Sequence, residues 1–324
     1  MQQYRDTNYA AVSAALHARE AHLLTSALSE RMLEAPTAEE SCKVLGECGY
    51  VLPERCTLAD VEEMLALARR TLYREVAVLA PDKRIVEIFR LKYDYHNAKL
   101  ALKAKRTGEE ASRLVIDCGR YDALALLRGE RGMFSSRMGR AMAQAERESE
   151  GGDVRAAELT LDRACFEEMS ALAKETESDF LIGYVALQID AINLRTLVRA
   201  QRMGASAELL SAALLPGGHI PAEQLKTARG DRLAELTRGS ALSAAGELAA
   251  SLASGSLTAF ERACDDALMQ YLQRARRTAF GPEVIVGYLS AKEAEFTAVR
   301  TILSGKLAGL SAEDIRARLR LSYL

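Results

Sequence analysis

One fifteen-residue segment of this chain occurs three times in similar form. Asp94–Gly108 aligns without gaps on Asp190–Gly204, and the two copies share an Asp, an Asn, two basic positions, an Ala and the final Gly. In a third copy, Glu295–Gly309, the acid is Glu and Ala replaces Asn, but a basic residue again follows the acid by five positions. Such self-similarity indicates homologous structural units, and it limits the possible folds more than any other feature.

The spacing of the copies predicts the domain organisation. They begin 96 and 105 residues apart, which is the size of a small domain. Each copy has the composition of a long helix that ends near a glycine. We therefore expect three homologous helical domains, at residues 1–112, 113–212 and 213–324.

Helix-forming residues dominate the chain, which predicts an all-α fold. Ala, Leu, Glu, Lys and Arg are abundant, Trp is absent, and no segment alternates β-branched with polar residues over the length of a strand. Pro282 is expected at a first helical position, and Thr37 and Ser311 are expected to begin helices through capping boxes. Each proline is expected at a helix boundary: Pro36, Pro53, Pro81, Pro216, Pro221 and Pro282.

The shared polar positions of the repeat favour a structural role over a catalytic one. Acidic and amide side chains on a helix can serve metals or proton transfer, but an active site is usually unique, and this set occurs in two different segments. We expect these side chains to join neighbouring helices through hydrogen bonds. The residues concerned are Asp94, Asn97, Lys99, Asp190, Asn193, Arg195, Glu295 and Arg300.

Four basic residues near the first copy form a narrow strip when wound as a helix, and they are candidates for contact with a partner. A solvated helix face is the alternative explanation of the same pattern. The residues are Lys92, Lys99, Lys103 and Arg106.

Composition and motifs exclude several other functions. The 43 basic and 45 acidic residues nearly cancel, so no nucleic-acid partner is expected. The sequence has no phosphate-binding G-x-x-x-x-G-K-[ST], no zinc-binding H-E-x-x-H and no nucleophilic G-x-S-x-G motif. We expect no cofactor, no metal and no enzymatic activity. Buried reduced thiols are expected at Cys42, Cys48, Cys56, Cys118, Cys165 and Cys264.

Neither a membrane span nor a secretory leader is predicted. The weakly charged stretches 203–222 and 241–260 each contain a glutamate and are rich in Ala, Gly and Ser. The N-terminus has no basic start followed by an apolar run, so a cytosolic location is expected.

Two long stretches resemble the C subunits of V-type ATPases, which are called d subunits in eukaryotes. Phe89–Lys105 is similar to the signature stretch of that family, and Tyr288–Leu319 is similar to its C-terminal stretch. Asp190–Arg195 fits the middle domain, so the resemblance extends along the chain. The departures are Ala98 and Ala101 in place of bulkier apolar residues, and the missing Asn of the third copy.

This resemblance implies a funnel-shaped, pseudo-threefold helical protein. Such a protein would lie at the cytoplasmic face of the membrane, peripheral to it, on the proteolipid ring of a rotary ATPase. It would receive the foot of the central shaft and transmit torque without catalysis, for transport of either protons or sodium ions. A helical-repeat adaptor of an unrelated complex is the alternative, and it predicts a solenoid with one concave face. An enzyme with a buried carboxylate site is a third possibility, which requires a cleft with converging titratable groups.

Overall fold

The computed structural model describes residues 6–130, 132, 134–251 and 257–324. Residues 1–5 of the N-terminus and residues 252–256 of the weakly charged stretch 241–260 lie outside the described residues.

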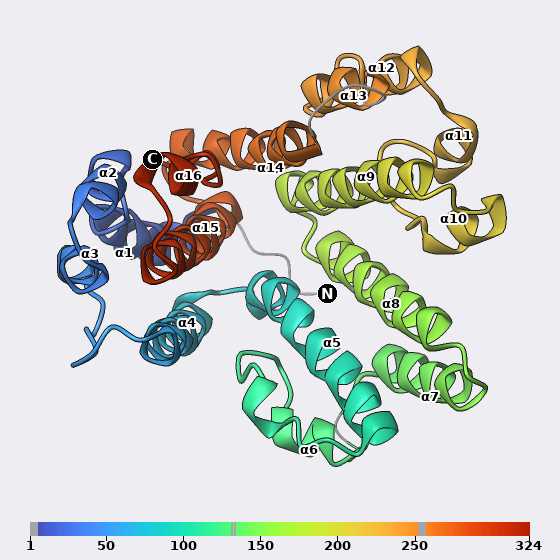
Figure 1. Ribbon diagram of the computed structural model, residues 1–324, viewed down its shortest axis with the longest axis horizontal. Helices are drawn as coiled ribbons and strands as arrows, with labels where there is room; N and C mark the ends of the chain where they lie inside the picture. Colours follow the sequence, from blue (N-terminus) through green and yellow to red (C-terminus); the bar gives the residue numbers. More distant parts are fainter. Residues whose placement is uncertain (1–5, 131, 133, 252–256) are drawn as a thin grey trace. The chain divides into compact units, whose positions relative to one another are not determined.

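The predicted all-α fold is confirmed, because regular structure in the described residues is helical and includes no strand (Figure 1). The α-helices are α1 (Ala10–Glu20), α2 (Ser26–Glu34), α3 (Ala38–Val44), α4 (Leu58–Leu79), α5 (Lys83–Thr107), α6 (Ala123–Leu127), α7 (Ser136–Glu150), α8 (Val154–Glu175), α9 (Asp179–Arg202), α10 (Ala207–Ala213), α11 (Ala222–Thr227), α12 (Asp231–Thr237), α13 (Ser243–Ala250), α14 (Leu257–Gln273), α15 (Pro282–Leu307) and α16 (Ala312–Arg316). Short 3-10 helices are η1 (Asp6–Tyr9), η2 (Leu45–Cys48), η3 (Ser112–Leu114) and η4 (Arg274–Arg277).

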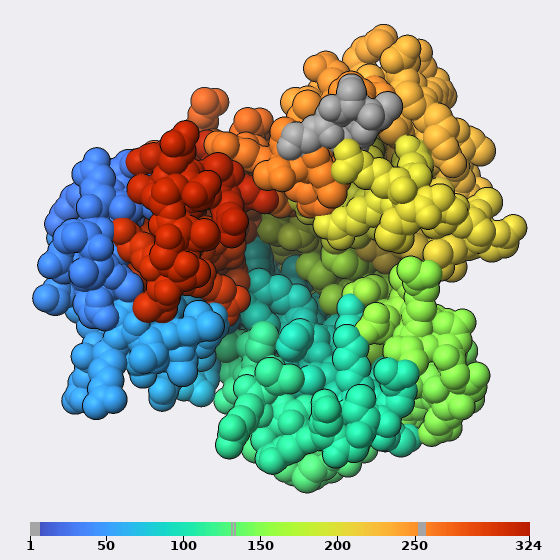
Figure 2. Space-filling model, in the orientation of Figure 1, coloured from blue at the N-terminus to red at the C-terminus, as the bar shows by residue number. Residues whose placement is uncertain are grey.

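The chain divides into two compact units. The first consists of Met1–Val86 and Met269–Leu324, and the second of Glu87–Leu268. In the first unit α1, α2 and α4 pack against α15, so segments from the two ends of the chain share one core (Figures 1 and 2). In the second unit α7 packs on α8, and α8 packs on α9. The three homologous domains stay a prediction, because a division by contacts does not test homology.

The six longest described helices follow one another in three pairs, α4 with α5, α8 with α9 and α14 with α15. The second helix of each pair carries one copy of the repeat. In α5 the apolar residues Leu91, Tyr95, Ala98 and Leu102, which recur every three or four positions, are all buried. The paired helices therefore carry the repeat into the core rather than onto the surface.

The predicted helix starts are found where the local sequence places them. The hydroxyl of Thr37 accepts the N–H of Glu40, and Ser311 accepts the N–H of Asp314. Pro282 occupies the first turn of α15, where its missing N–H leaves no helical hydrogen bond unmade. A full capping box, which was not predicted, forms at Thr57 and Asp60.

The six cysteines are free and buried, as predicted. Within the described ranges, no three or more His, Cys, Asp or Glu side chains are grouped to hold a metal ion.

By length and composition, α9 is the one described helix that could span a membrane. However, 61% of its apolar window is buried inside the protein. It also carries Asp190, Asn193 and Arg195, two of which are buried. These features are those of a core helix.

Candidate functional site

The carboxylate of Asp94, on α5, is fully buried and holds a loop of the chain through its backbone. One oxygen, Oδ1, accepts the N–H groups of Arg120 at 2.9 Å and Tyr121 at 3.3 Å. The other, Oδ2, accepts the Arg120 guanidinium at 3.0 Å. A buried carboxylate is costly unless it is hydrogen-bonded, so these donors are what allow Asp94 to lie here.

One turn further along α5, Asn97 holds the same loop at a second point. Its side-chain amide donates to the carbonyl of Ile116 at 2.9 Å and accepts the N–H of Ile116 at 3.0 Å. The side chain therefore imitates a backbone partner for a residue that lies outside any helix. We call the Asp and Asn of one copy, together with the loop they hold, a backbone clamp.

The second copy of the repeat forms the same backbone clamp. Asp190, on α9, accepts the N–H groups of His219 and Ile220, both at 3.0 Å. Asn193 donates to the carbonyl of Leu215 at 2.8 Å and accepts its N–H at 2.7 Å. The shared Asp and Asn side chains thus bind the backbone of a loop in both copies, whereas we expected them to join neighbouring helices.

A glycine completes each backbone clamp. A Cβ atom added at Gly119 would lie 2.1 Å from the Oδ1 atom of Asp94, and one added at Gly218 would lie 2.1 Å from Oδ1 of Asp190. Only a residue without a side chain lets the backbone approach the carboxylate this closely. This pair was not predicted, because the glycines follow the two aspartates by 25 and 28 positions and an ungapped alignment does not match them.

The acidic residue of the third copy binds a different part of the chain. Glu295, on α15, accepts the backbone N–H of Leu24 at 2.8 Å and the hydroxyl of Tyr50 at 2.6 Å, and it also pairs with Lys292. Both distant partners precede Glu295 by more than 240 residues. The third copy therefore binds the N-terminal segment, and not a loop that follows its own helix.

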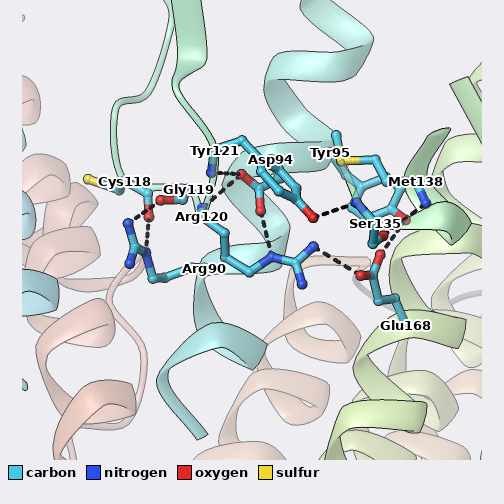
Figure 3. A network of polar contacts seen from close by, with 10 residues as sticks. All are labelled: Arg90, Asp94, Tyr95, Cys118, Gly119, Arg120, Tyr121, Ser135, Met138 and Glu168. Atoms are coloured by element: carbon cyan, nitrogen blue, oxygen red, sulfur yellow. Dashed lines mark hydrogen bonds and ion pairs between the residues drawn. The ribbon is translucent and has the colours of Figure 1, made fainter. Parts of the chain in front are cut away.

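The first backbone clamp is extended by a buried ionic network, shown in Figure 3. Arg120 bridges Asp94 and Glu168 on α8, and the Tyr95 hydroxyl donates to Glu168 at 2.8 Å. Burial raises the pKa of the Asp94 carboxyl, while the guanidinium of Arg120 opposes that shift. Burial and the neighbouring Glu168 carboxylate also raise the pKa of Tyr95, so its hydroxyl stays a donor.

The basic residue of each copy pairs with a carboxylate on the first helix of another pair. Lys99 on α5 pairs with Asp162 on α8, and Arg195 on α9 pairs with Glu261 and Asp265 on α14. Arg300 on α15 pairs with Glu62 on α4. The spacing of five that the copies share therefore places an acid inside the core and a base at a helix–helix contact.

The predicted basic strip contacts a neighbouring helix at two of its four positions. Lys99 and Lys103 pair with Asp162 and Glu158 of α8. Lys92 is exposed above the ring of Tyr93, and Arg106 is exposed near the end of α5. A partner contact at these residues stays a prediction.

The repeated clamps and helix pairs define a class of protein, a helical scaffold whose buried polar residues join segments of its own chain. Comparison with known proteins identifies the family. A model of the ATP synthase (C/AC39) subunit family matches residues 12–318, and the chain belongs to this family.

Individual relatives cover most of the chain at moderate identity. The C subunit of the V-type sodium ATPase of Enterococcus hirae is 26% identical over 272 residues, which cover 82% of this chain and 83% of the relative. The C subunit of the A-type ATP synthase of Methanocaldococcus jannaschii is 26% identical over 344 aligned residues, covering 96% and 86%. The corresponding A-type C subunit of Halobacterium salinarum is 30% identical over 176 residues, about half of each chain.

Adding one methyl group to either clamp glycine should destabilise the fold. We expect Gly119→Ala and Gly218→Ala each to lower the free energy of unfolding by about 1–3 kcal/mol, because the new Cβ overlaps a buried carboxylate. The matched control is Gly139→Ala on α7, where a Cβ meets no atom within 4 Å and helix propensity predicts a gain of about 0.5–1 kcal/mol. Chemical denaturation followed by circular dichroism measures all three, and equal stability of clamp and control variants would contradict the backbone clamp.

Replacing the side chain that pairs with the buried aspartate should cost more in the first backbone clamp than in the second. Arg120→Met leaves the carboxylates of Asp94 and Glu168 buried without their guanidinium, and we expect a loss of about 3–5 kcal/mol. The ring of His219 pairs with Asp190 but is 61% exposed, so His219→Met should cost at most about 1 kcal/mol. Urea denaturation compares the two variants, and a similar loss for both would overturn this ranking.

Proposed function

We propose that this chain is a non-catalytic rotor subunit of a V/A-type rotary ATPase that couples the central shaft to the membrane proteolipid ring. The observation that carries the proposal is the family match over residues 12–318, together with relatives named as C subunits of V-type and A-type complexes. The transported ion is a proton or a sodium ion.

The hydrogen bonds of the buried carboxylates support a mechanical role. Asp94, Asp190 and Glu295 each bind backbone N–H groups of the chain, so their carboxylates serve as internal joints rather than as groups that face a substrate. A subunit that transmits torque must resist deformation. Long helices joined at buried, fully hydrogen-bonded points meet that requirement.

The proposed position is peripheral, at the cytoplasmic face of the membrane, with the shaft and the ring as partners. The burial of α9 supports contact with the membrane through the ring rather than through a span of this chain. Rotor joints need broad complementary surfaces, and the exposed Lys92 and Arg106 are candidates for one of them.

We also propose the pseudo-threefold, funnel-shaped arrangement of three homologous domains. The ion pairs of the three copies support it, because each joins the second helix of one pair to the first helix of another: α5 to α8, α9 to α14 and α15 to α4. Three homologous units in which each unit contacts the next would give this same set of ion pairs.

Purification of the tagged chain from mildly solubilised membranes of its source cell tests the function. We expect a shaft subunit and a very hydrophobic ring proteolipid to copurify, as identified by mass spectrometry. A tagged helical protein of similar size and charge is the control for adhesion. Intact rotary complexes that lack this chain, with the chain recovered alone, would contradict the proposal.

A further inference from the structure

The loop between η2 and α4 presents apolar side chains to solvent. Val51 is 71% exposed, Leu52 is 39% exposed, and Leu58, the first residue of α4, is 55% exposed. We call these three residues the apolar tip. In Figure 1 this part of the chain lies at the lower left edge of the view, between α3 and α4.

Buried residues hold both ends of the loop in place. On one side Tyr50 is buried and donates its hydroxyl to Glu295 at 2.6 Å. On the other side Cys56 is buried, and its thiol contacts the carbonyl of Ala38 at 3.4 Å. The capping box of Thr57 and Asp60 then fixes the start of α4. The two ends of the loop are therefore held in place by buried contacts.

Single exposed apolar residues are ordinary on protein surfaces, but two on one anchored loop and a third at the start of the next helix indicate an interaction site. Binding at such a site is favoured, because a loop held in one conformation loses little conformational freedom when it docks. Val78, at the far end of α4, is 75% exposed and lies on a regular helix instead of an anchored loop. It is therefore a matched control for the apolar tip.

The charge of the sequence that contains the apolar tip indicates what kind of partner it fits. Residues 36–63 contain seven acidic side chains and two basic ones. Glu47 and Glu62 pair with Arg31 and Arg300, which leaves five acidic residues against two basic ones, or a net charge of −3. The charged residues of this stretch outside these two ion pairs are Glu39, Glu40, Glu54, Asp60 and Glu63, with Lys43 and Arg55.

An acidic stretch repels anionic lipid headgroups, and it repels the same stretch of a second copy. It favours a surface of opposite charge. We propose that the apolar tip docks into an apolar groove, rimmed by Lys and Arg, on a neighbouring protein subunit of the ATPase complex. This inference rests on the proposed function, because it takes that complex to be the chain's setting.

Photo-crosslinking in the assembled complex tests the proposal. A photoreactive benzoylphenylalanine replaces Val51 in one preparation and Val78 in the other, and each chain is added to the ATPase complex prepared without it. We expect position 51 to crosslink to a neighbouring subunit, at a peptide that combines apolar residues with Lys or Arg. Position 78 should give no such product.

Substitution measures how much the apolar tip contributes to binding. We expect the Val51→Ser, Leu52→Ser variant to bind the depleted complex at least about tenfold more weakly than the unchanged chain. Val78→Ser should bind within about twofold. All of these positions are exposed, so thermal unfolding of the variants should match that of the unchanged chain.

The outcomes separate this inference from the proposed function. If the unchanged chain fails to join the complex, the proposed function is overturned, and the docking inference with it. If it joins but position 51 crosslinks to lipid, to a second copy or to nothing, the docking inference alone is overturned. Equal binding by the Val51→Ser, Leu52→Ser variant would overturn it as well.

Discussion

The structure of this chain depends on buried carboxylates that bind backbone N–H groups. Removing a carboxylate from water is unfavourable, and Asp94 and Asp190 are tolerated in the core because each accepts two backbone donors from a loop. The loop in turn has no helical or sheet partner for those N–H groups, so the side chain satisfies them. The carboxylate gains donors and the loop N–H groups gain an acceptor, so removing either partner destabilises the fold.

The same contact explains how a helical chain can be rigid between its helices. Loops are usually the mobile part of a helical protein, because few backbone hydrogen bonds hold them. Here two loops are fixed to α5 and α9 at two points each, and the N-terminal segment is fixed to α15 through Glu295. The proposed function and this internal bracing agree, since a subunit that transmits torque must not flex where its helices join.

Features carried by local sequence could be predicted, and those that depend on distant segments could not. The helical fold and the start of α15 at Pro282 follow from composition and local sequence. The role of Gly119 and Gly218 depends on loops of different length, so no fixed spacing reveals it. The contact of Glu295 with Leu24 is hidden for the same reason, because it joins residues 271 positions apart. Local sequence likewise does not show that α8 carboxylates hold Lys99 and Lys103.

Native-state hydrogen exchange of the clamped amides tests the central claim most directly. The N–H groups of Arg120, Tyr121, His219 and Ile220 lie outside regular helices, yet the structure bonds each of them to a buried carboxylate. If the backbone clamps are the joints of the fold, these amides should exchange as slowly as those in the centres of α5 and α9. Exchange at rates typical of exposed loops would contradict the account.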